Sequence, residues 1–328
     1  MIEKGEVMSV RVDDSFLDSA ATADELAEDA RSGLTRTPKS LPPRWFYDAR
    51  GSELFEQITE LPEYYPTRTE AQILSSHAGD IASAAPVETV IELGSGSSVK
   101  TRLLLDAWQQ LGCLRRIITV DVSIAALTDA AAGLSARYPA AEVHPVRADF
   151  TRHLQRLPKL GRTAVVFLGS TIGNLDPMER ASFFSSLRES LAGGDALLLG
   201  TDLVKPAEVL VPAYDDAAGI TAEFNLNVLR VLNRELGGDL PVEAFSHRAV
   251  WNPAAERIEM RLRAEREIKA RFDLIGLEVH FDAGEELLTE ISSKFRRDGI
   301  AAELAAAGFE LRHWWSDPAK LFALSLSE

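Results

Sequence analysis

Hydrophobic and polar positions follow one clear pattern in the middle of the chain. Between about residues 69 and 202, segments with helical periodicity alternate with short runs rich in Val, Ile and Leu. This pattern is typical of a mostly parallel sheet covered by helices on both faces. The strands that it predicts are Thr89–Leu93, Arg116–Val122, Glu142–Ala148, Thr163–Leu168 and Ala196–Thr201. The expected fold class is therefore α/β, with a doubly wound sheet.

The alternation stops after Asp202, which indicates an inserted segment. Helical periodicity over residues 204–236 precedes strand-like stretches at 244–250, 257–264 and 268–280. A further helix is predicted over 299–307, and strands over 310–315 and 321–326 are expected to complete the main sheet as a terminal antiparallel hairpin. We therefore expect a flexible tail (1–20), a substrate-binding domain (21–68 plus 203–294) and a cofactor-binding domain (69–202 plus 295–328).

The N-terminal part of the substrate-binding domain is expected to be helical at 22–32 and 52–59. The prolines of Leu61–Pro66 predict an irregular segment, which is a candidate lid. Asp176, Pro177 and Glu179 form the pattern of a helix N-terminus, with Asp176 as the cap.

Composition and charge narrow the classes of function. The chain has 328 residues, of which 46% are hydrophobic and 26% charged, as expected of a globular protein. Its formal charge of −15 would repel phosphate backbones and anionic lipid surfaces. The single cysteine, Cys113, excludes an internal disulfide and fits a reducing cytoplasm. We expect a cytoplasmic protein, a monomer, that needs no metal and binds neither nucleic acid nor membrane.

The segment Val90–Thr101 predicts a cofactor-binding turn. An apolar strand leads into Gly94 and Gly96, which allow a sharp turn, and the next helix offers free N–H groups to a ligand. The third glycine of a dinucleotide motif would fall near Val99 and is absent. The motif therefore favours S-adenosylmethionine over NAD, although a tight turn alone would need glycines too.

Two acidic residues follow the next two predicted strands. Asp121 lies roughly 25 residues after the glycines, where doubly wound folds place the acid that binds ribose. Asp149 and Phe150 offer an acceptor and an aromatic face suited to adenine. Each Asp alone is also consistent with a helix cap or a solvated loop. The three strand ends together favour cofactor binding.

The exit of the fourth strand, Phe167–Leu175, is expected to face the reactive end of the cofactor. Asn174 is either a turn residue or, because Asp176 already caps the helix, an amide free to bind a ligand. Tyr64, Tyr65 and Tyr214 are either packing tyrosines or groups that cover a small polar ligand.

A predicted strand over Leu287–Phe295 places Glu290 and Ser292 on one face, with side chains roughly 7 Å apart. Such a pair can hold an imidazole between a carboxylate and a hydroxyl. The alternative is an ordinary solvent-facing strand edge.

Longer motifs carry a resemblance over nearly everything from Leu34 to the end. They are Lys39–Asp48, Gly51–Phe55, Leu61–Glu70, Phe167–Asn174 and Thr289–Ser292. With them the chain resembles the histidine-specific methyltransferase of ergothioneine biosynthesis. The resemblance implies a class I methyltransferase-like Rossmann sheet. It also implies an enzyme that uses S-adenosylmethionine, releases S-adenosylhomocysteine and methylates the α-amino nitrogen of free L-histidine three times, giving hercynine.

The resemblance also implies roles for single residues. Asn174 and Tyr214 would hold the substrate carboxylate, Tyr64 would lie beside the amino nitrogen, and Glu290 with Ser292 would grip the imidazole. The same pocket would be lined by Gly169, Thr171, Phe55 and Met260. Cofactor contacts would come from Tyr47, Gly94, Ser95, Lys100, Asp121, Asp149 and Phe150, with Lys100 at the methionine carboxylate. No strong base is evident, so Tyr64 and Asn174 are the catalytic candidates, acting through water.

Three alternatives remain open at this point. The first is a methyltransferase acting on another amino acid or small amine. The second is a non-catalytic protein that senses the cofactor or histidine. The third, an NAD oxidoreductase, conflicts with the missing third glycine.

Overall fold

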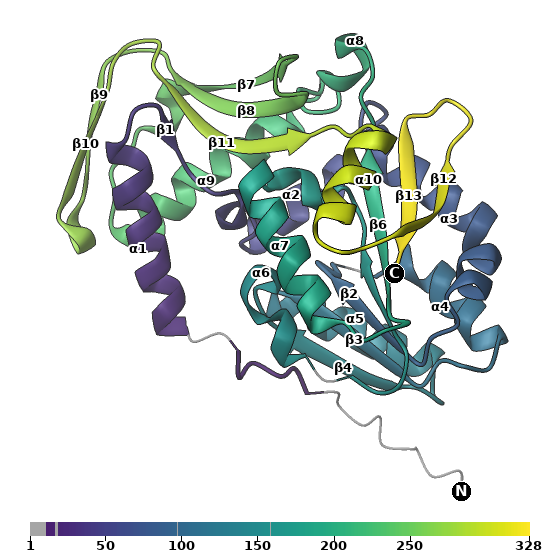
Figure 1. The fold of residues 1–328 in the computed structure, drawn as a ribbon. Coiled ribbons are helices and arrows are strands. Elements are labelled where there is room, and N and C mark those ends of the chain that lie inside the picture. The colour runs from purple at the N-terminus through teal and green to yellow at the C-terminus, as the bar shows by residue number, and fades with distance from the viewer. Residues whose placement is uncertain (1–10, 17–18, 97, 158) are drawn as a thin grey trace, which may run out of the picture.

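A seven-stranded sheet forms one end of the molecule, with strand order β12-β13-β6-β5-β2-β3-β4 (Figure 1). The computed structural model describes residues 11–16, 19–96, 98–157 and 159–328. The strands are β2 (Thr89–Leu93), β3 (Arg116–Asp121), β4 (Glu142–Arg147), β5 (Thr163–Phe167), β6 (Ala196–Asp202), β12 (Leu311–Ser316) and β13 (Phe322–Ser327). Strands β2 to β6 pair in parallel, and β13 is antiparallel to β6 and β12. The predicted strands and terminal hairpin are confirmed.

The strand order reverses at β2, because β2 pairs with β3 on one side and with β5 on the other. Every residue of β2 and β5 is buried, which explains why both read as continuous apolar runs in the sequence. Ligands of open α/β sheets bind at such a reversal, outside the carboxyl ends of the strands. The turns that follow β2 and β5 are therefore the walls of the expected site.

Helices cover both faces of this sheet. They are α3 (Tyr65–Ala84), α4 (Thr101–Gln110), α5 (Ile124–Arg137), α6 (Phe150–His153), α7 (Pro177–Ser190) and α10 (Arg297–Ala306), with short 3-10 helices at Leu154–Arg156 and Thr171–Asn174. The predicted start of α7 is confirmed, since Asp176 accepts from the N–H of Glu179 at 2.9 Å and Glu179 accepts from that of Asp176 at 2.7 Å. None of the helices that the structure describes is long and apolar enough to cross a membrane.

A second, four-stranded sheet lies at the opposite end of the molecule (Figure 1). Its order is β1 (Lys39–Ser40), β11 (Glu286–Ser293), β8 (Arg257–Ala264) and β7 (Phe245–Asn252), and a separate hairpin is formed by β9 (Ile268–Phe272) and β10 (Leu277–Phe281). Its helices are α1 (Ser19–Thr35), α2 (Ala49–Glu60), α8 (Ala207–Leu210) and α9 (Ile220–Leu236), with 3-10 helices at Pro43–Phe46, Val242–Ala244 and Asp273–Ile275. This part has its own buried apolar cluster.

Three expectations about local structure are wrong. The helical stretch over 204–236 is interrupted, since α8 ends at Leu210 and α9 begins after Gly219, whose φ of 75° suits glycine. The single stretch over 268–280 is two strands, separated by a turn at Gly276. The segment Leu61–Pro66 is not irregular throughout, because α3 begins at Tyr65. Pro66 lies in its first turn, where the missing N–H costs no hydrogen bond.

The apolar clusters support the two-domain division, which we propose with one changed boundary. The fully buried members of one cluster that the structure describes lie between residues 26 and 65 and between 210 and 287, and the other two clusters line the large sheet. Helix α3 runs unbroken across the expected boundary at 68, so the boundary belongs before Tyr65. Leu203 pairs with Phe295, so the connections at 203 and 295 lie side by side.

Most of the expected tail over residues 1–20 lies outside the described residues. Within its described part, the backbone of Asp13 pairs with the edge strand β4. The N–H of Asp13 donates to the carbonyl of Pro145, and the N–H of Arg147 donates to the carbonyl of Asp13, both at 2.8 Å. This contact holds residue 13 against the sheet.

Candidate functional site

The turn after β2 is an open cradle of backbone. Gly94 and Gly96 have φ of 66° and 47°, and a Cβ on Gly96 would meet nothing within 4 Å. Asp121, at the end of β3, accepts from the N–H of Gly96 at 3.1 Å and from that of Ser123 at 2.9 Å. Burial raises the pKa of Asp121. The Oγ of Ser95 is buried without a hydrogen-bond partner among the described residues, as expected for a group that meets a ligand.

Glu92 stabilises this turn by hydrogen bonds, a role that the sequence did not reveal. Its buried carboxyl accepts from the hydroxyl of Ser98 at 2.7 Å and from that of Thr101. Burial raises its pKa to about 7, against these two hydrogen bonds. Ser98 has a φ of 51°, so the two bonds help to fix a backbone conformation that a non-glycine residue rarely adopts.

Asp149 and Phe150 follow β4 and reach the same edge of the sheet. Asp149 caps α6, with one carboxylate oxygen accepting from the N–H of Thr151 at 2.8 Å. The helix-cap interpretation of Asp149 is thus confirmed, and its other oxygen lies 3.7 Å from Arg152. A Cβ on Gly94 would lie 4.0 Å from the ring of Phe150, so the ends of β2 and β4 meet here.

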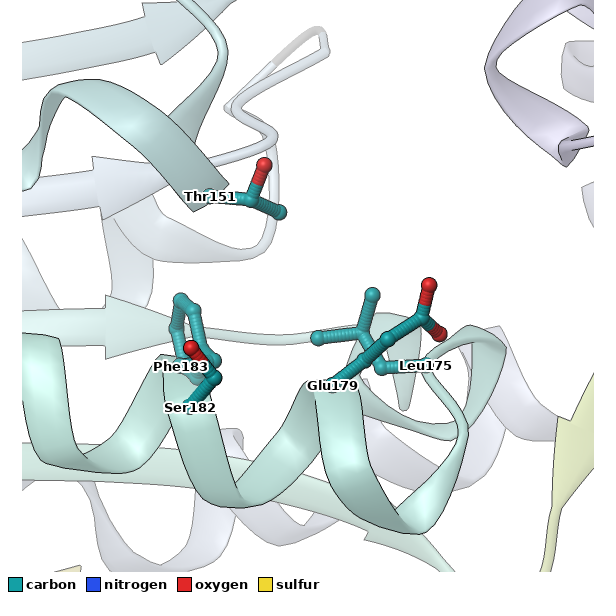
Figure 2. Close-up of a pocket in the computed structure, with 5 residues that line it drawn as sticks. All are labelled: Thr151, Leu175, Glu179, Ser182 and Phe183. Atoms are coloured by element: carbon teal, nitrogen blue, oxygen red, sulfur yellow. The ribbon is translucent and has the colours of Figure 1, made fainter. Parts of the chain in front are cut away.

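A cavity of about 210 Å³ adjoins these residues, between α6 and α7 (Figure 2). Figure 2 shows Thr151 on one side and Leu175, Glu179 and Phe183 on the other. The ring centroids of Phe183 and Phe150 lie 6.2 Å apart, so the cavity borders the expected adenine end of the site. Of the residues that line it, only Leu175 belongs to a segment expected at the site, Phe167–Leu175.

Lys100, expected at the methionine carboxylate, pairs with Glu70 of α3. The side chain of Glu70 is fully buried and also accepts from the N–H of Gly169, at 2.9 Å and 3.1 Å to its two oxygens. Glu70 therefore joins α3, the turn after β2 and the turn after β5. Sequence reasoning missed this residue, because a lone Glu in an amphipathic helix gives no signal of burial.

The predicted substrate residues form two contacting pairs. Asn174 lies close enough to Glu290 to lower the pKa of its carboxyl, and the hydroxyls of Tyr214 and Ser292 lie 2.8 Å apart. Glu290 and Ser292 are 9% and 5% exposed, which excludes the solvent-facing alternative for this strand. Burial raises the pKa of Glu290 to about 7, although the charge of Lys294 and the nearby Asn174 both lower it.

The backbone brings these pairs together at one place. A Cβ on Gly173 would lie 2.8 Å from the carbonyl oxygen of Ser293, so the 3-10 turn that carries Thr171 and Asn174 packs directly on β11. The buried Met260 of β8 is directly opposite Glu290 in the antiparallel ladder and shares its face. Gly169, with a φ of 76°, begins the same turn.

Aromatic rings form the wall between the two halves of the site. Tyr47 lies 5.6 Å from Phe55, and Tyr64 lies 6.3 Å from both Phe55 and Tyr214, measured between ring centroids. Burial raises the pKa of Tyr47, and the charges of Glu290 and Asp121 raise it further. Tyr47 therefore lies close enough to two acidic groups for their charges to affect it. One is Glu290, which with Ser292 forms the expected imidazole clamp, and the other is Asp121, the expected ribose ligand.

Tyr64 and Tyr65 are adjacent and equally buried but differ in their hydroxyl contacts. The hydroxyl of Tyr65 donates to Asp202, 2.8 Å away, and accepts from Lys205 at the same distance. That of Tyr64 has no hydrogen-bond partner among the residues described. Both are only 8% exposed, so they are part of the wall, and Tyr64 alone has a hydroxyl available to a ligand.

A buried ionic cluster lies behind the wall and was not predicted. Asp202 pairs with Lys205 and with Lys294, the latter at 2.8 Å. Burial would raise the pKa of Asp202, but the two lysines outweigh it and hold the pKa below its usual value. In the sequence Asp202 is visible only as a strand end, because Lys294 is distant in the chain and a lysine three residues on, Lys205, does not by itself indicate a buried pair.

His247 supports the loop that carries Tyr214. Its Nε2 lies 2.8 Å from the carbonyl oxygen of Tyr214 and its Nδ1 2.8 Å from the side-chain nitrogen of Asn225. Because a carbonyl can only accept, Nε2 carries the proton and Nδ1 accepts. Burial lowers the pKa of His247, so the neutral ring is favoured.

Comparisons with known proteins agree with this geometry. The family model of S-adenosylmethionine-dependent, histidine-specific methyltransferases matches residues 26–328. The chain is 56% identical to a histidine N-alpha-methyltransferase of Mycolicibacterium smegmatis, over 95% of this chain and 98% of that one. It is 55% identical to the histidine N-alpha-methyltransferase of Mycobacterium tuberculosis, over 92% of this chain and 94% of that one.

A third relative is a longer protein. The ergothioneine biosynthesis protein 1 of Schizosaccharomyces pombe is 36% identical over 61% of this chain and 27% of its own length. The family match spans nearly the whole chain and includes both halves of the site. The chain therefore belongs to the family of S-adenosylmethionine-dependent, histidine-specific methyltransferases.

Proposed function

We propose that this protein methylates the α-amino nitrogen of L-histidine three times with S-adenosylmethionine, giving hercynine in the first step of ergothioneine biosynthesis. The observation that carries the proposal is the position of Tyr47. It lies within electrostatic range of Glu290, in the buried clamp, and of Asp121, at the cofactor turn. In our proposal this aromatic wall serves both the polar site for the imidazole and the nucleoside site.

The residues present fit the cofactor. The open backbone at Gly96 and the hydroxyl of Ser95, which has no partner among the described residues, suit a polar ligand at the turn after β2. In our proposal Asp121 holds the ribose, Asp149 and Phe150 hold the adenine, and Lys100 holds the methionine carboxylate, with Tyr47 and Gly94 beside them. When bound, S-adenosylmethionine supplies a methyl group activated by its sulfonium.

The substrate residues are proposed to act by positioning. Glu290 and Ser292 would hold the two ring nitrogens, and Asn174 with Tyr214 would hold the carboxylate. Phe55, Met260, Gly169 and Thr171 would close the pocket around the side chain. Holding the amine in line with the methyl group replaces a reaction between two free molecules by a reaction within one complex. Such positioning can supply a large part of the rate enhancement of an enzyme.

The amino group must lose a proton before each transfer, because only the neutral amine has a free lone pair. Reference α-amino groups have a pKa of about 7.7–8.0. Burial raises the pKa of Tyr64 well above its usual value, so its hydroxyl stays protonated and orients groups rather than removing protons. We propose that the proton leaves through water held near Tyr64 and Asn174, and that aromatic faces stabilise the growing ammonium charge.

The wider setting of the proposal comes from charge and composition. The charge of −15 and the single cysteine support a cytoplasmic enzyme that acts on a small molecule, and we propose that it works as a monomer without a metal.

The deciding experiment is mass spectrometry of L-histidine after incubation with the protein and S-adenosylmethionine. The expected products are mono-, di- and finally trimethylated histidine. A panel of all common amino acids with labelled cofactor would show a different substrate, if that is the activity. Binding of histidine and cofactor without any methylated product would instead support a sensor, and binding of a nicotinamide cofactor would support an oxidoreductase.

A further inference from the structure

A lysine with no solvent access lies directly behind the proposed imidazole clamp. The side chain of Lys294 is 0% exposed, and its ammonium group lies 2.8 Å from Asp202, 2.8 Å from Ser292 and 2.7 Å from Tyr214. An ammonium group has three donors and no acceptor. The ammonium group therefore donates hydrogen bonds to the hydroxyl oxygens of Ser292 and Tyr214, which both act as acceptors, and forms an ion pair with Asp202.

The two hydroxyls also contact each other, which limits where their protons point. Tyr214 and Ser292 have one hydroxyl proton each, and their oxygens are 2.8 Å apart. One proton bridges them, and the other is free for a ligand. A hydrogen bond from a cation polarises the hydroxyl that accepts it and strengthens that hydroxyl as a donor. A ligand that opens the bridge therefore meets two donors.

The charges around the pair favour an uncharged ligand at Ser292. Lys294 and Lys205 share the carboxylate of Asp202, and the carboxyl groups of Asp317 and Glu290 act on Lys205 and Lys294 respectively. The charge in direct contact with Ser292 is the ammonium group of Lys294. The other titratable groups that face the pair among the described residues are Glu290 of β11 and the tyrosines Tyr47, Tyr64 and Tyr65. A second cation placed against Ser292 would lie just in front of the ammonium group and would be repelled by it.

We propose that Lys294 is a positioning residue that makes Ser292 a hydrogen-bond donor, so that the clamp selects the neutral imidazole ring of the substrate. The ring nitrogen that faces Glu290 then carries the proton, and the nitrogen that faces Ser292 presents its lone pair. The inference rests on the proposed function and goes beyond it, because it names the protonation state that is bound and the residue that sets it.

The first test is NMR spectroscopy of ¹⁵N-labelled histidine bound with S-adenosylhomocysteine, at about pH 6, below the reference histidine pKa of about 6.5. Much of the free ligand is then protonated at both ring nitrogens. The expected spectrum of the bound ring has one protonated and one unprotonated nitrogen. A bound ring with protons on both nitrogens overturns the inference. Because this test uses the wild-type protein, it does not depend on the folding of any variant.

Two lysine variants separate positioning from stability. Lys294→Met and Lys205→Met each remove one partner of Asp202, but Lys205 donates to Tyr65 and to the carbonyl of Leu203 and has no contact with Ser292 or Tyr214. Lys294→Met should weaken histidine binding roughly 10–100-fold, the scale of a lost charged hydrogen bond, and shift the bound ring toward the doubly protonated form. Lys205→Met should keep the affinity and the neutral ring.

Equal losses of histidine affinity in Lys294→Met and Lys205→Met, with the same protonation of the bound ring, would mean that Lys294 is only structural. That result would overturn the inference. If Lys294→Met does not fold, Lys294→Gln keeps N–H donors without the charge, and its loss of affinity should still exceed that of Lys205→Met. A loss no greater than that of the control would contradict the inference. Wild-type protein that neither binds nor methylates histidine would refute the proposed function instead, so the two failures are distinguishable.

Discussion

Gly173 packs so closely on Ser293 that a Cβ atom at position 173 would lie 2.8 Å from the carbonyl oxygen of Ser293 and 3.2 Å from its nitrogen. Both atoms belong to the backbone of β11 and cannot swing away as a side chain could. The contact joins the turn after β5 to the small sheet. It thereby brings Asn174, next in the chain, close to the carboxyl of Glu290.

Gly173→Ala should therefore damage the site more than the fold. The added methyl group must push the turn away from β11, at a cost of about 1–3 kcal/mol for overpacking. Histidine affinity, measured by calorimetry, should fall about tenfold or more because Asn174 and Glu290 separate. Gly193→Ala is the matched control, since a Cβ there meets nothing within 4 Å. Histidine binding equal to that of the control would show that the close contact does not position the site.

Glu70→Gln tests the junction between α3 and the two turns. The substitution keeps the size of the side chain but removes the charge that pairs with Lys100 and bonds the N–H of Gly169. The free energy of unfolding in urea should fall by about 1–3 kcal/mol, the cost of impairing a buried charged hydrogen bond.

The control for Glu70 is Glu53→Gln. Glu53 pairs with Arg50 on the surface of α2, with its side chain 65% exposed. Exposed pairs contribute about 0–1 kcal/mol, so this variant should lose little stability. A loss for Glu70→Gln no larger than that for Glu53→Gln would mean that the junction is not a stabilising contact.

The sequence predicted those parts of the fold and site that depend on local pattern. The strands β2, β5 and β6 read as apolar runs because both of their faces are buried, and the start of α7 is visible because Asp176 and Glu179 cap it through neighbours in the chain. Glu70 and Lys294 gave no such signal. Their partners, Gly169 for one and Asp202 for the other, are about a hundred residues away, and only the folded topology brings them together.

Glu290 should make stability depend on pH in a definite direction. Burial raises its pKa from 4.5 to about 7, so the folded state favours the protonated carboxyl. Its contribution to stability is therefore fully present below pH 4.5 and is lost as the pH rises through 7.

Glu290→Gln removes this titration and allows it to be measured. The variant should gain stability relative to wild type between about pH 4.5 and 7, by about 3 kcal/mol at 1.36 kcal/mol for each unit of pKa shift, and the difference should be level above pH 8. Urea unfolding at a series of pH values measures the difference. A difference that does not change with pH would show that the carboxyl has an ordinary pKa in the folded protein.

Tyr64 and Tyr65 allow the catalytic proposal to be tested with two neighbouring substitutions. The hydroxyl of Tyr64 has no partner among the described residues, so Tyr64→Phe should leave the free energy of unfolding unchanged within about 0.5 kcal/mol. It should still lower kcat/KM for histidine by about 10–100-fold, since positioning of a reacting group is worth that much or more.

Tyr65→Phe should do the opposite. It removes the hydrogen bonds to Asp202 and Lys205, which costs about 1–3 kcal/mol of stability, while the amino group of the histidine substrate keeps its proposed contact with Tyr64. Rates of all three methylations, followed by mass spectrometry beside urea unfolding curves, separate the two effects. Full activity of Tyr64→Phe in every methylation would assign its hydroxyl no part in the reaction, and the water path for the proton would then have to depend on Asn174 alone.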